Sequence, residues 1–361
     1  MSPRSIVPPS RRSLLLGAAA VAPLVALGAG SASAAGLGGF RNAAGLRMID
    51  GSPWVHDDIR SVDFRFDTGG QVRTFPPSVR VTVPPSYADN PDKRYPVLLL
   101  LHGGTGMFLD WTSWGNVVEE TEKHEVIVVM PDGGAGSFYS NANFPLPGRT
   151  ANWESFIMTQ VLPFVHENFR TDSARMAIAG LSMGGWGALA LGQRYYGHFR
   201  SVSSYSGPAD CGLTPAGFLV NAVIWGGPAA DALKYFGTAN QMGATWGHTL
   251  YPEVAKGYNP LANIDKYKGK RLFLRTGDGW WLDGFDKYPD IAQRIKDKAL
   301  SFGADLQESV VMATQTDFSR ELDRAGVEHE FEVINGATHT PDLWTASLTE
   351  DLPGMMKALN A

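Results

Sequence analysis

The chain has 361 residues, a hydrophobic fraction of 44% and a formal net charge of −5. This length supports a sizeable hydrophobic core, and the acidic balance argues against nucleic acid or an anionic lipid surface as the main partner. The single cysteine, Cys211, excludes an intrachain disulfide, so the core has to stabilise the fold without one.

The first 34 residues have the features of an export signal. The pair Arg11-Arg12 precedes an apolar run over 14–27, and Ala32-Ser33-Ala34 offers a small-residue cleavage site. The apolar run is shorter than the ~20 residues of a membrane span, although an uncleaved anchor is the alternative. We predict a twin-arginine-type signal peptide at 1–34, no stable membrane insertion and a secreted or cell-wall-associated protein. Loss of the three arginines in the signal changes the net charge from −5 to −8.

After the signal, short apolar segments alternate with amphipathic ones. Strands are predicted, in chain order, at 59–66, 79–83, 96–101, 126–130, 175–179, 202–206, 272–274 and 331–334. The continuously apolar runs are typical of parallel strands that are covered on both faces. Helices are expected at 153–169, at about 308–325 and at 341–358. The alternation predicts an α/β fold with a mostly parallel, doubly wound sheet.

Residues from about 207 to 265 interrupt this alternation. They are rich in Gly, Pro, Ala, Trp and Tyr, and the segment is too long for an ordinary connection. We expect one domain at 35–361 with a cap-like insertion at about 207–265. A loosely structured surface excursion is the alternative.

A nucleophile motif lies between the predicted strand at 175–179 and the helical pattern that follows it. Gly180-Leu181-Ser182-Met183-Gly184 matches G-x-S-x-G, a sharp strand-to-helix turn that exposes a serine hydroxyl. The glycines leave room for the turn. The sequence therefore predicts Ser182 as a catalytic nucleophile, and a glycine-rich helix start with Ser182 as N-cap is the alternative.

A serine nucleophile needs a base and an acid, in the chain order serine, acid, histidine. His339 follows the last predicted strand and is the expected base, ahead of His248 and His329. The acid should follow the strand at 272–274. Three aspartates compete there, and spacing alone does not choose among them: Asp278, Asp283 and Asp286.

Stabilisation of an oxyanion needs backbone N–H donors beside the serine. The N–H of Met183 is one expected donor, and the other should come from the glycine-rich loop after the strand at 96–101. We choose Gly104, with Gly103 second, and expect His102 to brace this loop. An ordinary glycine-rich turn is the alternative.

Taken together, these motifs resemble the esterase D and antigen 85 branch of the α/β-hydrolases over essentially the whole length after the signal. The resemblance rests on residues 81–84, 95–104, 128–134, 137–140, 153–156, 180–183 and 335–339. It implies an α/β-hydrolase fold and places the acid at Asp283. One departure is that the mycolyltransferases carry Asp-Gly-Leu-Arg where this chain has His102-Gly103-Gly104-Thr105. The missing arginine argues against mycolate transfer to trehalose.

The resemblance implies a secreted serine carboxylic ester hydrolase that acts on an ester or acyl-lipid through an acyl-enzyme. The alternatives are an acyltransferase with a sugar or glycerol acceptor and a non-catalytic cell-wall or matrix binding protein. Three aromatic side chains are candidate substrate contacts, with core packing as the alternative: Trp111, Phe138 and Tyr139. The sequence contains no nucleotide or zinc motif, so neither a cofactor nor a metal is expected.

Overall fold

The computed structural model describes residues 36–360 except 231–233, 235–239, 249–250 and 280–290. Side chains of 291–305 are also outside this description. The predicted signal peptide at 1–34 and the predicted acid Asp283 therefore lie outside the described residues. Among the described helices, none combines the length and the apolar character that crossing a bilayer requires.

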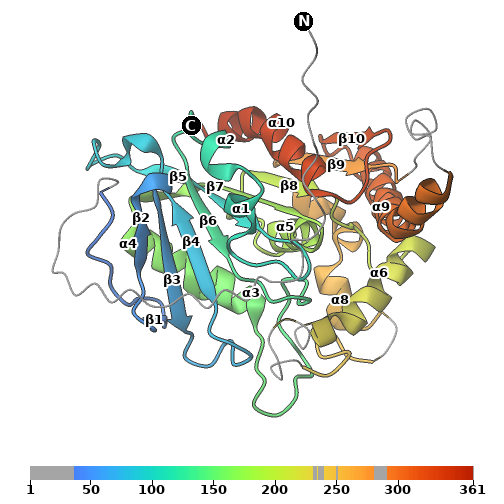
Figure 1. Ribbon diagram of the computed structural model, residues 1–361, viewed down its shortest axis with the longest axis horizontal. Helices are drawn as coiled ribbons and strands as arrows, with labels where there is room; N and C mark the ends of the chain where they lie inside the picture. The colour runs from blue at the N-terminus through green and yellow to red at the C-terminus, as the bar shows by residue number, and fades with distance from the viewer. Residues whose placement is uncertain (1–35, 231–233, 235–239, 249–250, 280–290, 361) are drawn as a thin grey trace, which may run out of the picture. The chain divides into compact units, whose positions relative to one another are not determined.

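Within the described residues, ten strands form one sheet in the order β1-β3-β4-β6-β5-β7-β8-β9-β10, with β2 paired to β3 (Figure 1). The strands are β1 (Arg47–Met48), β2 (Trp54–His56), β3 (Ser61–Asp67), β4 (Ser78–Thr82), β5 (Tyr95–Leu101), β6 (Ile127–Pro131), β7 (Thr171–Leu181), β8 (Ser201–Tyr205), β9 (Arg271–Gly277) and β10 (Glu330–Ile334). In this spatial order, neighbouring strands from β6 to β10 pair in parallel. The pairings that involve β1, β2, β3 or β4, including that of β4 with β6, are antiparallel. The predicted mostly parallel sheet is confirmed.

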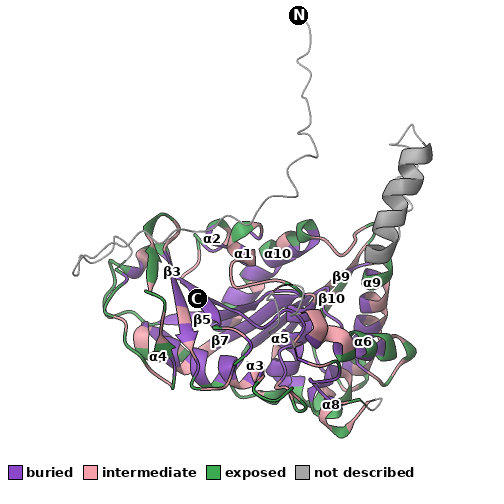
Figure 2. Cartoon of the chain, turned by 60° about the horizontal axis from the view of Figure 1, so that its bottom comes forward, coloured by how far each residue is buried: buried purple, intermediate pink, exposed green. Residues whose placement is uncertain are grey.

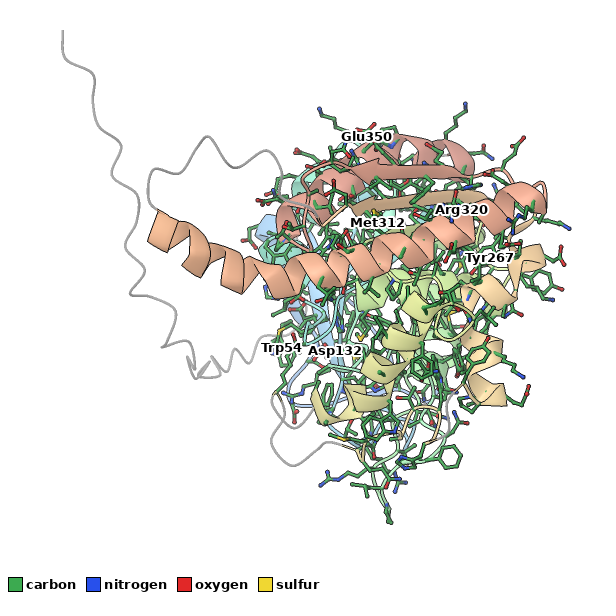
Figure 3. All side chains as sticks on the ribbon, turned by 90° about the vertical axis from the view of Figure 1, so that its right-hand side faces the viewer. Trp54, Asp132, Tyr267, Met312, Arg320 and Glu350 are labelled. Carbon is green, nitrogen blue, oxygen red and sulfur yellow. The ribbon has the colours of Figure 1, made fainter. Side chains whose placement is uncertain are left out.

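Helices cover both faces of this sheet. They are α1 (Asp110–Ser113), α2 (Val117–Glu120), α3 (Trp153–Ser155), a π-helical stretch (Phe156–Val161), α4 (Leu162–Asn168), α5 (Met183–Arg194), α6 (Pro215–Gly226), α8 (Glu253–Tyr258), α9 (Ile291–Arg324) and α10 (Pro341–Leu359). Short 3-10 turns lie at Asp57–Ile59, Pro85–Tyr87, Gly227–Ala229, Pro260–Ala262 and Ile264–Tyr267. Figure 3 shows α9 crossing one side of the molecule, with Met312 and Arg320 labelled on it.

The central strand β5 shows how the two faces are filled. Its alternate side chains divide between two buried clusters: Val97, Leu99 and Leu101 face the layer of α3, α4, α5 and α9, and Leu98 and Leu100 face the layer of α1, α2 and α10. Successive side chains of a strand point to opposite faces, so an apolar run is buried on both sides. Figure 2 shows the central strands as buried.

The register brings several strand ends to one edge of the sheet. Leu101 pairs with Gly180, Leu181 with Tyr205, and Gly277 with Ile334. The loops after β5, β7, β8, β9 and β10 therefore begin at a common edge, which is where parallel α/β sheets place their sites.

The predicted insertion at 207–265 lies between β8 and β9, and its described part contains α6 and α8. Helix α6 lies beside α9, as Figure 1 also shows. Trp246 is buried and packs against Trp186 of α5 at a ring-centroid distance of 5.9 Å. Cys211 is buried too, in agreement with a structural residue.

Candidate active site

Ser182 occupies the turn between β7 and α5, so the predicted strand–turn–helix context is confirmed. Its backbone has φ 52° and ψ −121°, a strained conformation for a residue with a side chain. A Cβ added to Gly184 would lie 2.5 Å from the carbonyl oxygen of Leu101, and one added to Gly180 would lie 2.4 Å from that of Gly184. The glycines thus allow the helix to approach the strand closely enough to form the turn.

His339 connects Ser182 to a buried carboxylate. His339 Nε2 lies 2.7 Å from Ser182 Oγ, and His339 Nδ1 lies 2.5 Å from Oε2 of Glu308 on α9. A neutral imidazole satisfies both contacts when Nδ1–H donates to Glu308 and Nε2 accepts from the serine hydroxyl. The geometry matches a nucleophile, a base and an orienting acid.

The environment of Glu308 keeps this carboxylate charged. The side chain is fully buried, and its Oε1 accepts hydrogen bonds from Ser206 Oγ at 2.7 Å, Thr276 Oγ1 at 2.7 Å and the N–H of Gly277 at 2.6 Å. Burial raises the pKa of Glu308, but the hydrogen bond and charge of His339, together with these donors, outweigh it. The net effect is a lowered pKa.

Glu308 takes the place beside His339 that the sequence analysis assigned to Asp283. Asp283 and Asp286 lie outside the described residues, and Asp278 instead accepts a hydrogen bond from the N–H of Gly336 at 3.1 Å. The carboxylate comes from a helix, 31 residues after the strand end that it contacts. Glu308 is therefore the candidate acid among the described residues, and the role of Asp283 stays a prediction.

A sequence signal for Glu308 existed. It stands on the buried stripe of α9, together with Val311, Gln315, Phe318 and Leu322. An acidic residue at a core position of an amphipathic helix requires a partner, because an unpaired buried charge is costly.

The loop after β5 lies against the candidate nucleophile. A Cβ added to Gly103 would be 3.5 Å from Cβ of Ser182. The N–H of Thr105 donates to the carbonyl of Ala135 at 2.7 Å. Met183 is the first residue of α5, where N–H groups have no acceptor within the helix. The pairing of Gly104 with Met183 as oxyanion donors stays a prediction.

His102 braces this loop, as expected. Its Nε2 accepts from the N–H of Gly133 at 2.8 Å, which leaves Nδ1–H to donate to the carbonyl of Gly103 at 2.7 Å. Burial lowers the pKa of His102 to about 4, so the ring is neutral near pH 7. The ammonium of Lys234, from the insertion, donates to the carbonyls of Thr105 and Gly106 on the same loop.

The three predicted aromatic substrate contacts are buried. Trp111 is 1% exposed and its indole N–H donates to the carbonyl of Leu101, whereas Tyr139 is fully buried and its hydroxyl donates to the carbonyl of His102. Phe138 packs edge-on against Trp186. Their burial favours the core-packing alternative, in which they support the loops around the site, and their contact with substrate stays a prediction.

The sequence analysis also missed Gln307, an exposed residue beside Glu308. Its Nε2 lies 3.0 Å from His339 Nε2, so consecutive residues of α9 approach the two nitrogens of one ring. Trp344 packs edge-on against the His339 ring at 5.0 Å. In the part of the chain that the structure describes, no three His, Cys, Asp or Glu side chains gather as a metal site would require.

Comparisons of the sequence point to one family. A family described as "putative esterase" matches residues 75–355. An esterase of Mycobacterium tuberculosis is 34% identical over 320 residues, which cover 86% of this chain and 62% of that relative. The diacylglycerol acyltransferase/mycolyltransferase Ag85C of Mycobacterium avium is 28% identical over 266 residues, 69% of this chain and 67% of the relative.

Solved structures share the fold. A ferulic acid esterase superposes with a TM-score of 0.53 at 24% identity, covering 82% of this chain and 98% of the other. The MPT51 structure of Mycobacterium tuberculosis superposes with a TM-score of 0.57 at 18% identity, covering 79% and 94%. These likenesses identify an α/β-hydrolase fold.

Proposed function

The chain belongs to the esterase family of the α/β-hydrolases, and on this premise we propose that it hydrolyses carboxylic esters through an acyl-serine intermediate. The observation that carries the proposal is the pair of hydrogen bonds that links Glu308 through His339 to Ser182. A serine hydroxyl is a weak nucleophile at neutral pH, and this arrangement supplies the base that activates it.

The reaction follows from the positions of these groups. Ser182 Oγ attacks the ester carbonyl carbon while its proton passes to His339 Nε2, and Glu308 stabilises the imidazolium through Nδ1–H. The N–H groups of Gly104 and Met183 stabilise the oxyanion, a contribution of about 3 kcal/mol per donor in such sites. The imidazolium then protonates the leaving alcohol, and water releases the acid from the acyl-serine in the same way.

Acyl transfer to a sugar or glycerol hydroxyl is the second candidate, favoured by the likeness to the Ag85C acyltransferase/mycolyltransferase. The chemistry is the same, with an alcohol in place of water. Against it, Thr105 stands where the mycolyltransferase pattern carries arginine. A non-catalytic binding protein is disfavoured because Ser182, His339 and Glu308 are all present and in contact. If glycerol or trehalose is added to the reaction and becomes acylated, the result would favour transfer over hydrolysis.

The first test is labelling of Ser182. A fluorophosphonate probe and a short-chain p-nitrophenyl ester should modify Ser182 in the wild type, as mass spectrometry of the digested protein would show. Ser182→Ala should abolish both labelling and turnover, because the acyl-enzyme cannot form. Ser113→Ala, at an exposed serine of α1, is the matched control and should behave as wild type. Full ester turnover by Ser182→Ala would contradict the proposal.

We further propose that the chain is exported by a twin-arginine route and acts outside the cytoplasm. The support is the pair Arg11-Arg12 before the apolar run, with Ala32-Ser33-Ala34 after it. Replacement of both arginines by lysine should abolish the appearance of the protein outside the cell, and the exported wild type should begin near Ala35 by mass spectrometry. Undiminished export of the double-lysine variant would reject the route.

A further inference from the structure

Gln307 places a carboxamide at the reacting nitrogen of His339. Its Nε2 is 3.0 Å from His339 Nε2, and Ser182 Oγ approaches the same nitrogen at 2.7 Å. Nδ1–H of His339 is engaged by Glu308, so Nε2 has one lone pair for two neighbouring donors. The contact of Gln307 therefore lies where protons enter and leave the ring.

Every oxygen that exchanges a proton with His339 must come within hydrogen-bond reach of Nε2. One such oxygen is Ser182 Oγ. The others are the leaving alcohol and the water that cleaves the acyl-enzyme. Because Gln307 already lies at this distance and is exposed, its carboxamide is adjacent to the position of that second oxygen.

We propose that Gln307 is a positioning residue for the water that cleaves the acyl-serine, an inference that rests on the proposed esterase function. The water donates one proton to His339 Nε2 and attacks the acyl carbon, so its second hydrogen needs an acceptor. The carbonyl oxygen of the Gln307 amide supplies it after rotation about the terminal torsion, which is broad and nearly two-fold. Collapse of the intermediate passes the proton from His339 to Ser182 Oγ and releases the acid.

The two residues at this point of α9 have separate tasks. Glu308 is fully buried and held by three donors from the strand ends, so it fixes both the helix and the ring. Gln307 is exposed and contributes no buried contact to the core. Its replacement is therefore expected to alter one step of the reaction and to leave the fold and the position of His339 intact.

The test separates acylation from deacylation. With p-nitrophenyl acetate, the burst of p-nitrophenolate reports acylation, and the following steady state reports deacylation. Gln307→Met keeps the length of the side chain and removes its polar atoms. We expect the burst rate constant to stay within about twofold and deacylation to fall about tenfold, the effect of one lost hydrogen bond to the reacting water.

Two variants define the control and the rescue. Leu306→Met changes the preceding exposed residue and should leave both rate constants unchanged. Gln307→Glu keeps an acceptor for the water and should recover most of the deacylation rate. After the ester is exhausted, acetylated Ser182 should persist about tenfold longer in Gln307→Met than in wild type.

The outcomes are distinguishable. An equal fall of the burst and steady-state rate constants in Gln307→Met would mean that the residue merely supports His339, and unchanged rates would mean that it has no role. Either result overturns the inference while the proposed function stands. A wild type without a burst or any labelling of Ser182 would instead reject the esterase proposal itself.

Discussion

At Glu308, burial acts to raise the pKa of the carboxylate, but the hydrogen bond and charge of His339, with hydrogen bonds from Gly277 and Thr276 at the end of β9, act in the opposite direction and lower it. The net lowering of its pKa favours the charged carboxylate at neutral pH. A charged Glu308 therefore accepts the hydrogen bond from His339 Nδ1–H at neutral and mildly acidic pH.

Glu308→Gln is expected to lower kcat by about 10³- to 10⁴-fold, because an amide in this place no longer stabilises the imidazolium or fixes the tautomer. Steady-state kinetics with a p-nitrophenyl ester measures the effect. Asp278→Asn and Asp283→Asn should stay within about twofold of wild type, since Glu308 already occupies His339 Nδ1. A dead Asp283→Asn with an active Glu308→Gln would restore the original assignment.

His102 gives the stability a pH dependence. Its pKa is about 4 in the fold and about 6.5 in an unfolded chain, so the unfolded state binds more protons between these values. The free energy of unfolding should therefore fall as the pH drops from 6.5 to 4, by about 3 kcal/mol from this group. Urea unfolding of wild type and His102→Gln across this range measures it. If the free energy of unfolding fell equally with pH in wild type and His102→Gln, the result would contradict the explanation.

Two residues of the proposed catalytic relay, Ser182 and His339, were predicted from local sequence, and the third, Glu308, was not. Ser182 has a five-residue motif between a strand and a helix, and His339 follows a recognisable last strand. Glu308 has no motif, because its position depends on how α9 packs over the ends of β8 and β9. Only its place on a buried helix stripe distinguishes it from other glutamates.

At the scale of the element, the turn between β7 and α5 depends on close backbone contact. Gly184→Ala would place a Cβ 2.5 Å from the carbonyl oxygen of Leu101 and 2.6 Å from that of His102. We expect a loss of about 3 kcal/mol in the free energy of unfolding and a fall in kcat, because the turn must open. Chemical denaturation and ester kinetics measure both.

The matched control is Gly226→Ala, at the end of α6, where an added Cβ meets nothing within 4 Å. It should be neutral or slightly stabilising, since alanine restricts the unfolded chain. Wild-type stability of Gly184→Ala would show that the turn tolerates a side chain there.

The predicted strands correspond to β3 through β10: the central ones, such as β5 and β6, are apolar runs buried on both faces, which are distinctive in sequence, whereas β10 is only partly buried. The strands β1 and β2 were not predicted, since segments of two and three residues have no periodicity. Helix α9 begins at Ile291, whereas the expected start was about 308. The sequence before 308 carries apolar residues at helical spacing as well, among them Ile291, Ile295, Phe302 and Leu306, and the sequence analysis did not recognise them.

At the scale of the whole molecule, α10 is fixed to the sheet by a buried carboxylate. Asp351 accepts from Tyr205 Oη of β8 at 2.6 Å and pairs with the guanidinium of Arg271 on β9. All three side chains lie on the face opposite α5, within or beside the cluster of α1, α2 and α10. The helix that follows His339 is thus tied to the middle of the sheet.

Asp351→Asn is expected to cost about 2 kcal/mol in the free energy of unfolding, because the half-buried guanidinium of Arg271 loses its buried charged partner and keeps only the exposed Glu330. Glu350→Gln, at the exposed neighbouring position labelled in Figure 3, should change stability little. Urea unfolding compares the two, and kcat at 25 °C should be unchanged in both. Equal stability of the variants would show that the pair is dispensable.

The anchoring of Glu308 also bears on how this scaffold can diversify. Its carboxylate accepts hydrogen bonds from Gly277, Thr276 and Ser206 at the strand ends. Loops elsewhere at this edge of the sheet can therefore change in length or sequence to suit new esters, as a recognition loop is exchanged on an antibody framework, while these three contacts keep the carboxylate in place.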